Sequence, residues 1–108
     1  MISRFPGLTP TRSRAVVHGD LVFTVAVAPD PVTSSMYVQS VKARLALCGS
    51  HKSKILSAIV YIADMSRKSE MNRAWDEWVD KGNPPLRACI GVDLESPHIV
   101  EVVVTAAK

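Results

Sequence analysis

The hydrophobic pattern along the chain predicts its strands. Residues 21–28 are mostly β-branched or aromatic, which favours a strand, and the turn dipeptide Gly19-Asp20 separates them from a shorter apolar run at 15–18. These two runs predict an opening hairpin. Residues 55–63 form a nearly continuous apolar run, which is typical of a strand buried on both faces.

Two helices are predicted between the strands. The first has its apolar positions at helical spacing, at Val38, Val41, Leu45 and Cys48. Ser34 or Ser35 can cap this helix. The second carries one apolar stripe, made of Met71, Ala74, Trp75, Trp78 and Val79. Ser66 can cap the second helix, and Gly82 follows its end.

The last part of the chain predicts two more strands, at 86–92 and 99–104, joined as a hairpin around Glu95-Ser96-Pro97. The element order is then ββαβαββ, an α+β fold in which two helices cover one face of a sheet. The runs 55–63 and 100–104 look apolar on both faces, so something must cover the second face. We expect a homo-oligomer with sheet packed against sheet; the alternative is a monomer with an unusually apolar exposed sheet.

Composition narrows the class of protein. With 108 residues, of which 47% are hydrophobic, the chain is expected to form one domain spanning residues 1–108. The net charge of +3 is modest and its basic residues are scattered, which argues against nucleic-acid binding. Neither a signal peptide nor an apolar run of membrane-spanning length is found. Cys48 and Cys89 lack metal-ligand spacing, so a reduced, cytoplasmic protein without a metal site is expected.

Two charges stand inside the apolar strands near the end of the chain, Arg87 and Glu101. An unpaired charge there would cost several kcal/mol, so each needs a function or a partner. The planar fork of Arg87 suits a small carboxylic acid. If the hairpin pairs odd positions with odd positions, Arg87, Cys89 and Glu101 share one surface, whereas a slip of one residue separates them.

Simpler explanations exist for these residues. Arg87 and Glu101 could form an ion pair inside the oligomer. Cys89 could be a nucleophile, but no His/Asp arrangement that would activate it is visible, and a small buried apolar residue is the favoured interpretation.

Several segments together resemble the RidA (YjgF) family. They are Asp64-Met65, Met71-Asn72, Trp75, the strand start from Pro84 to Cys89, and Val100-Glu101-Val102. The similarity covers Ser13 to Ala107 in element order and is most specific from Ile55 onward. The element order is also that of this family, whose fold resembles chorismate mutase of the trimeric type.

The resemblance implies a homotrimer with ligand clefts between neighbouring subunits. It also implies hydrolysis of reactive enamines and imines, such as 2-aminoacrylate or 2-iminopropanoate, to 2-oxo acids and ammonia, with no metal or organic cofactor. Arg87 matches the family arginine that clamps the substrate carboxylate, and Glu101 matches the glutamate that helps position the attacking water. Cys89 lies in the strand that lines the cleft, and Asn72 matches a nearby asparagine.

The chain departs from the family pattern at the cleft wall. Many members have Gly-Pro-Tyr-Ser where this chain has Thr9 to Ser13, and Ser-Gly-Gln where it has Val25 to Val27. Arg12 could occupy the aromatic position and add a second positive charge, which would favour a dicarboxylate. Two further functions stay open: a non-catalytic trimer that binds a small carboxylate or metabolite, and an endoribonuclease, a label that this family has also carried.

Overall fold

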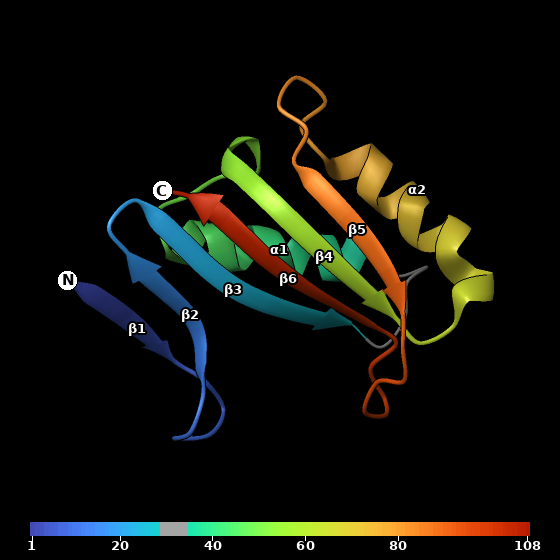
Figure 1. Ribbon diagram of the computed structural model, residues 1–108, viewed down its shortest axis with the longest axis horizontal. Coiled ribbons are helices and arrows are strands. Elements are labelled where there is room, and N and C mark those ends of the chain that lie inside the picture. Colours follow the sequence, from blue (N-terminus) through green and yellow to red (C-terminus); the bar gives the residue numbers. More distant parts are fainter. Residues whose placement is uncertain (29–34) are drawn as a thin grey trace.

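The fold is a mixed sheet with two helices packed on it (Figure 1). A computed structural model describes residues 1–28 and 35–108. The strands that it describes are β1 (Ile2–Pro6), β2 (Ser13–His18), β3 (Leu21–Ala28), β4 (Ile55–Ile62), β5 (Leu86–Gly91) and β6 (Val100–Ala107). The helices are α1 (Ser35–Leu47) and α2 (Lys68–Trp78), and short 3-10 turns precede β4 and α2.

The opening hairpin is confirmed as β2 and β3, which pair antiparallel. Gly19 in its turn has a φ of 60°, a left-handed conformation that glycine adopts without a steric penalty. One strand was missed by the sequence pattern. β1 pairs antiparallel with β2 and extends the sheet, although it is short, contains Arg4 and ends at Pro6.

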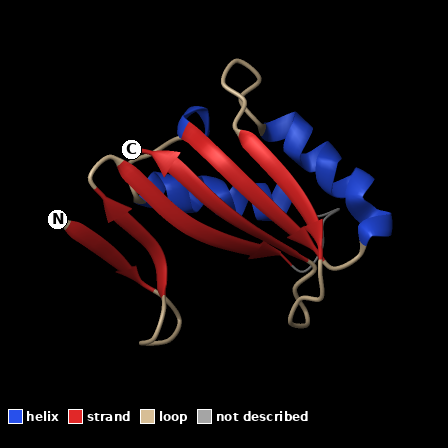
Figure 2. Cartoon of the chain, in the orientation of Figure 1, coloured by secondary structure: helices blue, strands red, loops and turns tan. Residues whose placement is uncertain are grey.

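The predicted hairpin of the last two strands is wrong. The sheet order is β1-β2-β3-β6-β4-β5, so β4 lies between β5 and β6. β5 pairs parallel with β4, and β6 pairs antiparallel with both β3 and β4. The loop around Pro97 does reverse the chain, but it carries β6 past β4 into the centre of the sheet (Figure 2).

One face of the sheet and the helices form the core. Along β6 the even positions, Val100 to Ala106, are at most 1% exposed, while the odd positions are partly exposed. The predicted apolar positions of α1 are buried, and so are Met71, Trp75 and Trp78 of α2. This alternation places every even residue of β6 under the helices and every odd one on the opposite face.

That opposite face is left uncovered by the chain itself. Leu21, Phe23, Val25 and Ile90 are each 39–43% exposed, and neighbouring strands place Ile59 and Val103 beside them. We call this surface the open face. The expectation that two helices cover only one face of the sheet is therefore confirmed. The open face exposes several large apolar side chains side by side, which is unusual for a surface in contact with water.

The helix starts differ in part from the sequence prediction. Ser34 lies outside the described residues. Ser66 is not the cap of α2; instead the Asp64 carboxylate accepts hydrogen bonds from the Ser66 N–H at 3.0 Å and its hydroxyl at 2.6 Å, which closes the 3-10 turn before α2. None of the described helices has the length and apolar character needed to cross a membrane.

Candidate functional site

Arg87 lies on edge strand β5, on the side of the sheet that α2 covers. Its Cα is paired with Ala58, which is buried beneath the helices. The guanidinium carbon lies 5.8 Å from the centre of the Trp75 ring, and Nη1 lies 3.8 Å from the Met71 sulfur. Both contacts come from α2, so the helix holds the arginine from one side and the strand from the other.

No carboxylate neutralises this guanidinium within the part of the chain that the structure describes. The ion pair found there joins Arg67 to Glu70 at 2.8 Å, within α2 and the turn before it. Arg87 instead contacts an aromatic ring and a thioether, and its charge acts on the buried Tyr37, whose pKa it lowers in part. A half-buried cation in such surroundings favours an anionic ligand, because the charge is only partly hydrated and meets no opposite charge.

Tyr37 links the two helices behind this arginine. Its hydroxyl donates to the Met71 carbonyl at 3.1 Å, and the side chain is fully buried. Burial raises the pKa of Tyr37 well above its ordinary value, and the nearby Arg87 charge lowers it only in part. Tyr37 therefore stays a neutral hydrogen-bond donor, and its role here is to hold Met71.

Cys89 shares the Arg87 side of β5. Its thiol is half-buried and reduced, and its Cα pairs with Val60. The N–H of Val92, just after β5, donates to the Ile62 carbonyl of β4. Successive N–H groups along a strand point to opposite edges, so the even residues of β5 direct their N–H groups to β4. The N–H groups of Arg87 and Cys89 therefore point away from β4. An anion held by Arg87 could therefore also receive a backbone hydrogen bond at this edge.

Glu101 does not lie beside Arg87. It pairs with Val27 on one side and Tyr61 on the other, all on the open face. Arg87 and Cys89 are on the helix side. Odd residues of β6 pair with odd residues of β4, such as Glu101 with Tyr61, whereas odd residues of β4 pair with even residues of β5. The condition for one shared surface, odd positions paired with odd positions across a hairpin of the last two strands, is therefore not met in a single chain. An Arg87–Glu101 ion pair inside an oligomer stays a prediction.

The open face instead brings Glu101 together with the residues that depart from the family pattern. Val27 is its direct partner across β3 and β6, and Val25 is the partner of Val103, two residues along the same face. The carboxylate therefore stands in an apolar strip of two neighbouring strands.

The two other candidate residues lie apart from each other. Asn72 is on α2, next to Met71 in sequence, and its Oδ1 is buried without a hydrogen-bond partner. Arg12 is exposed in the turn between β1 and β2, where it lines a shallow cavity of about 370 Å³ with Arg4. Because β1 and β5 are the two edges of the sheet, Arg12 and Arg87 of one chain cannot hold the same small ligand.

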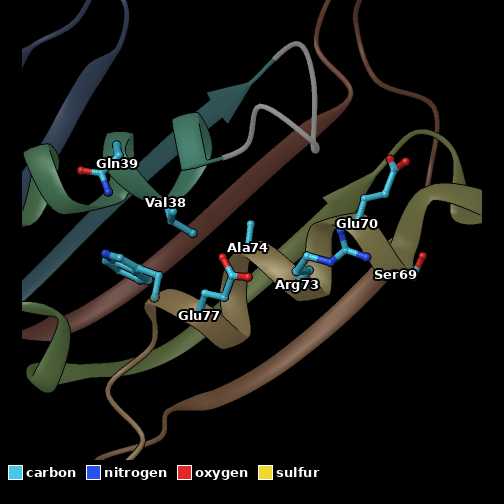
Figure 3. Close-up of a pocket in the computed structure, with 8 residues that line it drawn as sticks. Val38, Gln39, Ser69, Glu70, Arg73, Ala74 and Glu77 are labelled. Carbon is cyan, nitrogen blue, oxygen red and sulfur yellow. The ribbon is translucent and has the colours of Figure 1, made fainter.

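A separate groove of about 550 Å³ lies between α1 and α2 (Figure 3). Its charged groups come from α2, where Arg73 stands between Glu70 and Glu77, and Gln39 faces them from α1. None of the predicted site residues lines it. The sequence signal that could have indicated it is the polar flank that each helix carries beside its apolar stripe.

The chemistry available at Arg87 is anion binding in a partly dehydrated setting. Among the residues described, His, Cys, Asp and Glu do not gather in a group of three that could hold a metal ion. The Arg87 guanidinium and the outward-pointing N–H of Cys89 offer two kinds of donor at the β5 edge. A small molecule with a carboxylate matches this set better than a neutral one.

Comparisons with known proteins identify relatives along nearly the whole chain. The sequence profile of the endoribonuclease L-PSP family matches residues 12–108. A RutC family protein of Haemophilus ducreyi is 37% identical, with 99% of this chain and 97% of the relative aligned. A YjgF family member of Neisseria meningitidis has a solved structure that is 38% identical, covers 100% of this chain and 95% of its own, and has a TM-score of 0.85. An uncharacterised protein of Pseudomonas aeruginosa is 28% identical with a TM-score of 0.90, over 100% of this chain and 99% of its own.

Proposed function

The chain belongs to the RidA/YjgF family, to which the endoribonuclease L-PSP description also applies, and from this membership we propose that it hydrolyses small imines and enamines carrying a carboxylate. The products would be a 2-oxo acid and ammonia. The observation that carries the proposal is Arg87, a half-buried guanidinium beside Trp75 and Met71 with no carboxylate partner among the described residues.

In this reaction Arg87 would bind the substrate carboxylate through two parallel hydrogen bonds. An enamine such as 2-aminoacrylate first gains a proton at its terminal carbon and loses one from nitrogen, which gives 2-iminopropanoate. Water then adds to the C=N carbon and one of its protons passes to the nitrogen. The remaining hydroxyl proton also passes to the nitrogen as the C–N bond breaks, which releases ammonia and pyruvate. Because an imine is already electrophilic, holding it beside one oriented water supplies most of what the step needs.

We further propose that the site is completed by a second copy in a homotrimer. Glu101 would orient the water, yet in one chain it lies on the open face, away from Arg87. If the open face of one subunit meets the β5 edge of the next, Glu101 of one copy approaches Arg87 of its neighbour. Burial of the exposed apolar side chains of the open face favours such an assembly.

The direct test measures pyruvate and ammonia release from 2-aminoacrylate that a serine dehydratase generates in situ, with semicarbazide as the competing trap. The wild-type protein is compared with Arg87→Ala and with Arg73→Ala, a matched control on the α1 side of α2. We expect acceleration by the wild type and by Arg73→Ala, but not by Arg87→Ala. No acceleration by a folded wild-type protein would contradict the proposal.

Mixing two inactive variants tests the shared site. Arg87→Ala and Glu101→Gln are unfolded together and refolded, so that trimers form at random. If each site takes Arg87 from one copy and Glu101 from the next, about one quarter of the sites are intact, and that share of activity returns. If both residues act from the same chain, no activity returns.

A second candidate is a trimer that binds a small carboxylate without turning it over. The observation that favours it is the apolar pair Val25 and Val27 beside Glu101, where many family members have polar residues. A rise in the melting temperature with 2-oxobutanoate, without product formation from any imine tried, would support this candidate.

A further inference from the structure

We infer that Trp75 is the positioning residue that presents Arg87 to a ligand carboxylate. The inference rests on the proposed function for the nature of the ligand, but its geometry comes from the described contacts alone. The Arg87 guanidinium carbon lies 5.8 Å from the centre of the Trp75 ring, within the range in which the ring face attracts a cation. Trp75 is thus its aromatic neighbour on α2.

An aromatic ring and a carboxylate hold a guanidinium in different ways. A carboxylate would occupy two N–H donors and cancel the charge, whereas a ring face attracts the cation and accepts none of these hydrogen bonds strongly. A second contact of Arg87 with the described residues is weak, from Nη1 to the Met71 sulfur at 3.8 Å. Arg87 is therefore fixed in place while most of its donors stay available for a ligand.

Trp75 can do this because its own ring is held firmly. It is 5% exposed, and its ring meets that of Trp78 edge to face, with centres 5.8 Å apart and planes at 60°. On Trp78, the Lys52 ammonium lies 5.7 Å from the ring centre and donates to the Trp78 carbonyl at 2.7 Å. Lys52, Trp78, Trp75 and Arg87 thus contact one another in this order, from the 3-10 turn before β4 to the edge strand β5.

The second support of Arg87 is equally fixed. Tyr37 of α1 donates its hydroxyl to the Met71 carbonyl at 3.1 Å, so the residue whose sulfur contacts Arg87 is anchored to the other helix. Trp75 and Met71 are one helical turn apart and both are buried. Arg87 consequently rests on a surface of α2 that cannot move without breaking core contacts.

The test compares Trp75→Leu with Trp75→Phe. Loss of the ring is expected to weaken pyruvate binding by about 2- to 30-fold, the range of one cation–π contact, whereas Trp75→Phe keeps a ring and should retain much of the affinity. In the imine assay, KM should rise by the same factor while kcat changes little. A purely structural role would lower the active fraction, and hence the apparent kcat, without moving KM.

Leu45→Ala is the control, since Leu45 is 1% exposed in α1 and its loss destabilises the core without touching Arg87. Calorimetric titration with pyruvate separates this inference from the proposed function. If pyruvate binds in an Arg87- and Trp75-dependent way but no imine is hydrolysed, the positioning role stands and the activity fails. If Arg87→Ala abolishes binding or turnover while folded Trp75→Leu and Trp75→Phe match the wild type in dissociation constant and KM, the positioning role is overturned.

Discussion

Placing a carboxylate at the centre of the open face should keep the fold and prevent assembly. Val103 of β6 pairs with Val25 on one side and Ile59 on the other, and its side chain is partly exposed in the single chain. Val103→Glu therefore adds a charge that water can hydrate in the monomer. In an assembly that covers the open face, the same charge would be buried among apolar side chains.

The estimated free energies favour dissociation of the Val103→Glu assembly. Leu21, Phe23, Val25 and Ile90 are 39–43% exposed, and complete burial of such a side chain contributes about 1.5–3 kcal/mol. Covering the exposed fraction of all four contributes about 2–5 kcal/mol per copy. Burying an unpaired carboxylate costs several kcal/mol per copy, which offsets this gain at each subunit.

Light scattering coupled to size-exclusion chromatography, with circular dichroism, measures both outcomes. We expect a trimer mass for the wild type, and a monomer mass with an unchanged far-ultraviolet spectrum for Val103→Glu. The reasoning is refuted if the wild type is a monomer at all concentrations, or if Val103→Glu assembles as tightly as the wild type. Val103→Glu should also lose imine hydrolysis, because a monomer has no neighbouring copy to supply Glu101.

Three further predictions concern the single chain. Val102→Ala, one residue from Val103 but 0% exposed under the helices, should lower the free energy of unfolding by about 2–3 kcal/mol in urea titrations while assembly is retained. The Ser66 hydroxyl, and then the Ser66 N–H, hold the pKa of Asp64 below its ordinary value. The stabilisation is therefore complete above the unfolded pKa of about 4 and is lost as pH falls through the folded pKa. The melting temperatures of Asp64→Ala and wild type should differ at neutral pH, and the difference should shrink as pH falls below about 4. Gly7→Ala would place a Cβ 2.6 Å from the Arg12 carbonyl oxygen, so it should destabilise the β1–β2 turn, seen as faster amide exchange there than in wild type; equal exchange would count against this contact.

The strands and helices could be predicted because their signals are local. The apolar stripe of α2 follows from the helical period, and its Met71, Trp75 and Trp78 are buried as expected. The apolar run at 100–104 predicted a strand, but β6 buries only its even positions and leaves the odd ones partly exposed. β1 was missed because its five residues, with Arg4 and Pro6, carry no such period. It becomes a strand only because β2 offers it an edge.

The candidate site could be predicted in part, since residue type and strand position are local but pairing is not. Arg87 was identified as a charge in an apolar strand, and the structure places it against Trp75 and Met71 with no carboxylate partner among the described residues. Its relation to Glu101 depended on which strands are neighbours, and β4 between β5 and β6 reverses the expected parity. Trp75 was identified as part of the apolar stripe of α2, but its contact with Arg87 was not predicted, because nothing in the sequence reveals that Arg87 lies over its ring.

The two edges of the sheet have a consequence for solubility. An unpaired edge strand can accept another strand, and repeated additions would build an open-ended fibre. Here β1 ends at Pro6, which lacks an N–H donor, and its register is interrupted between Phe5 and Pro6. The β1 edge is thereby a poor template for a further strand. An open-ended fibre needs two edges that accept strands, so copies that meet through the open face can form a closed, finite particle and remain dissolved.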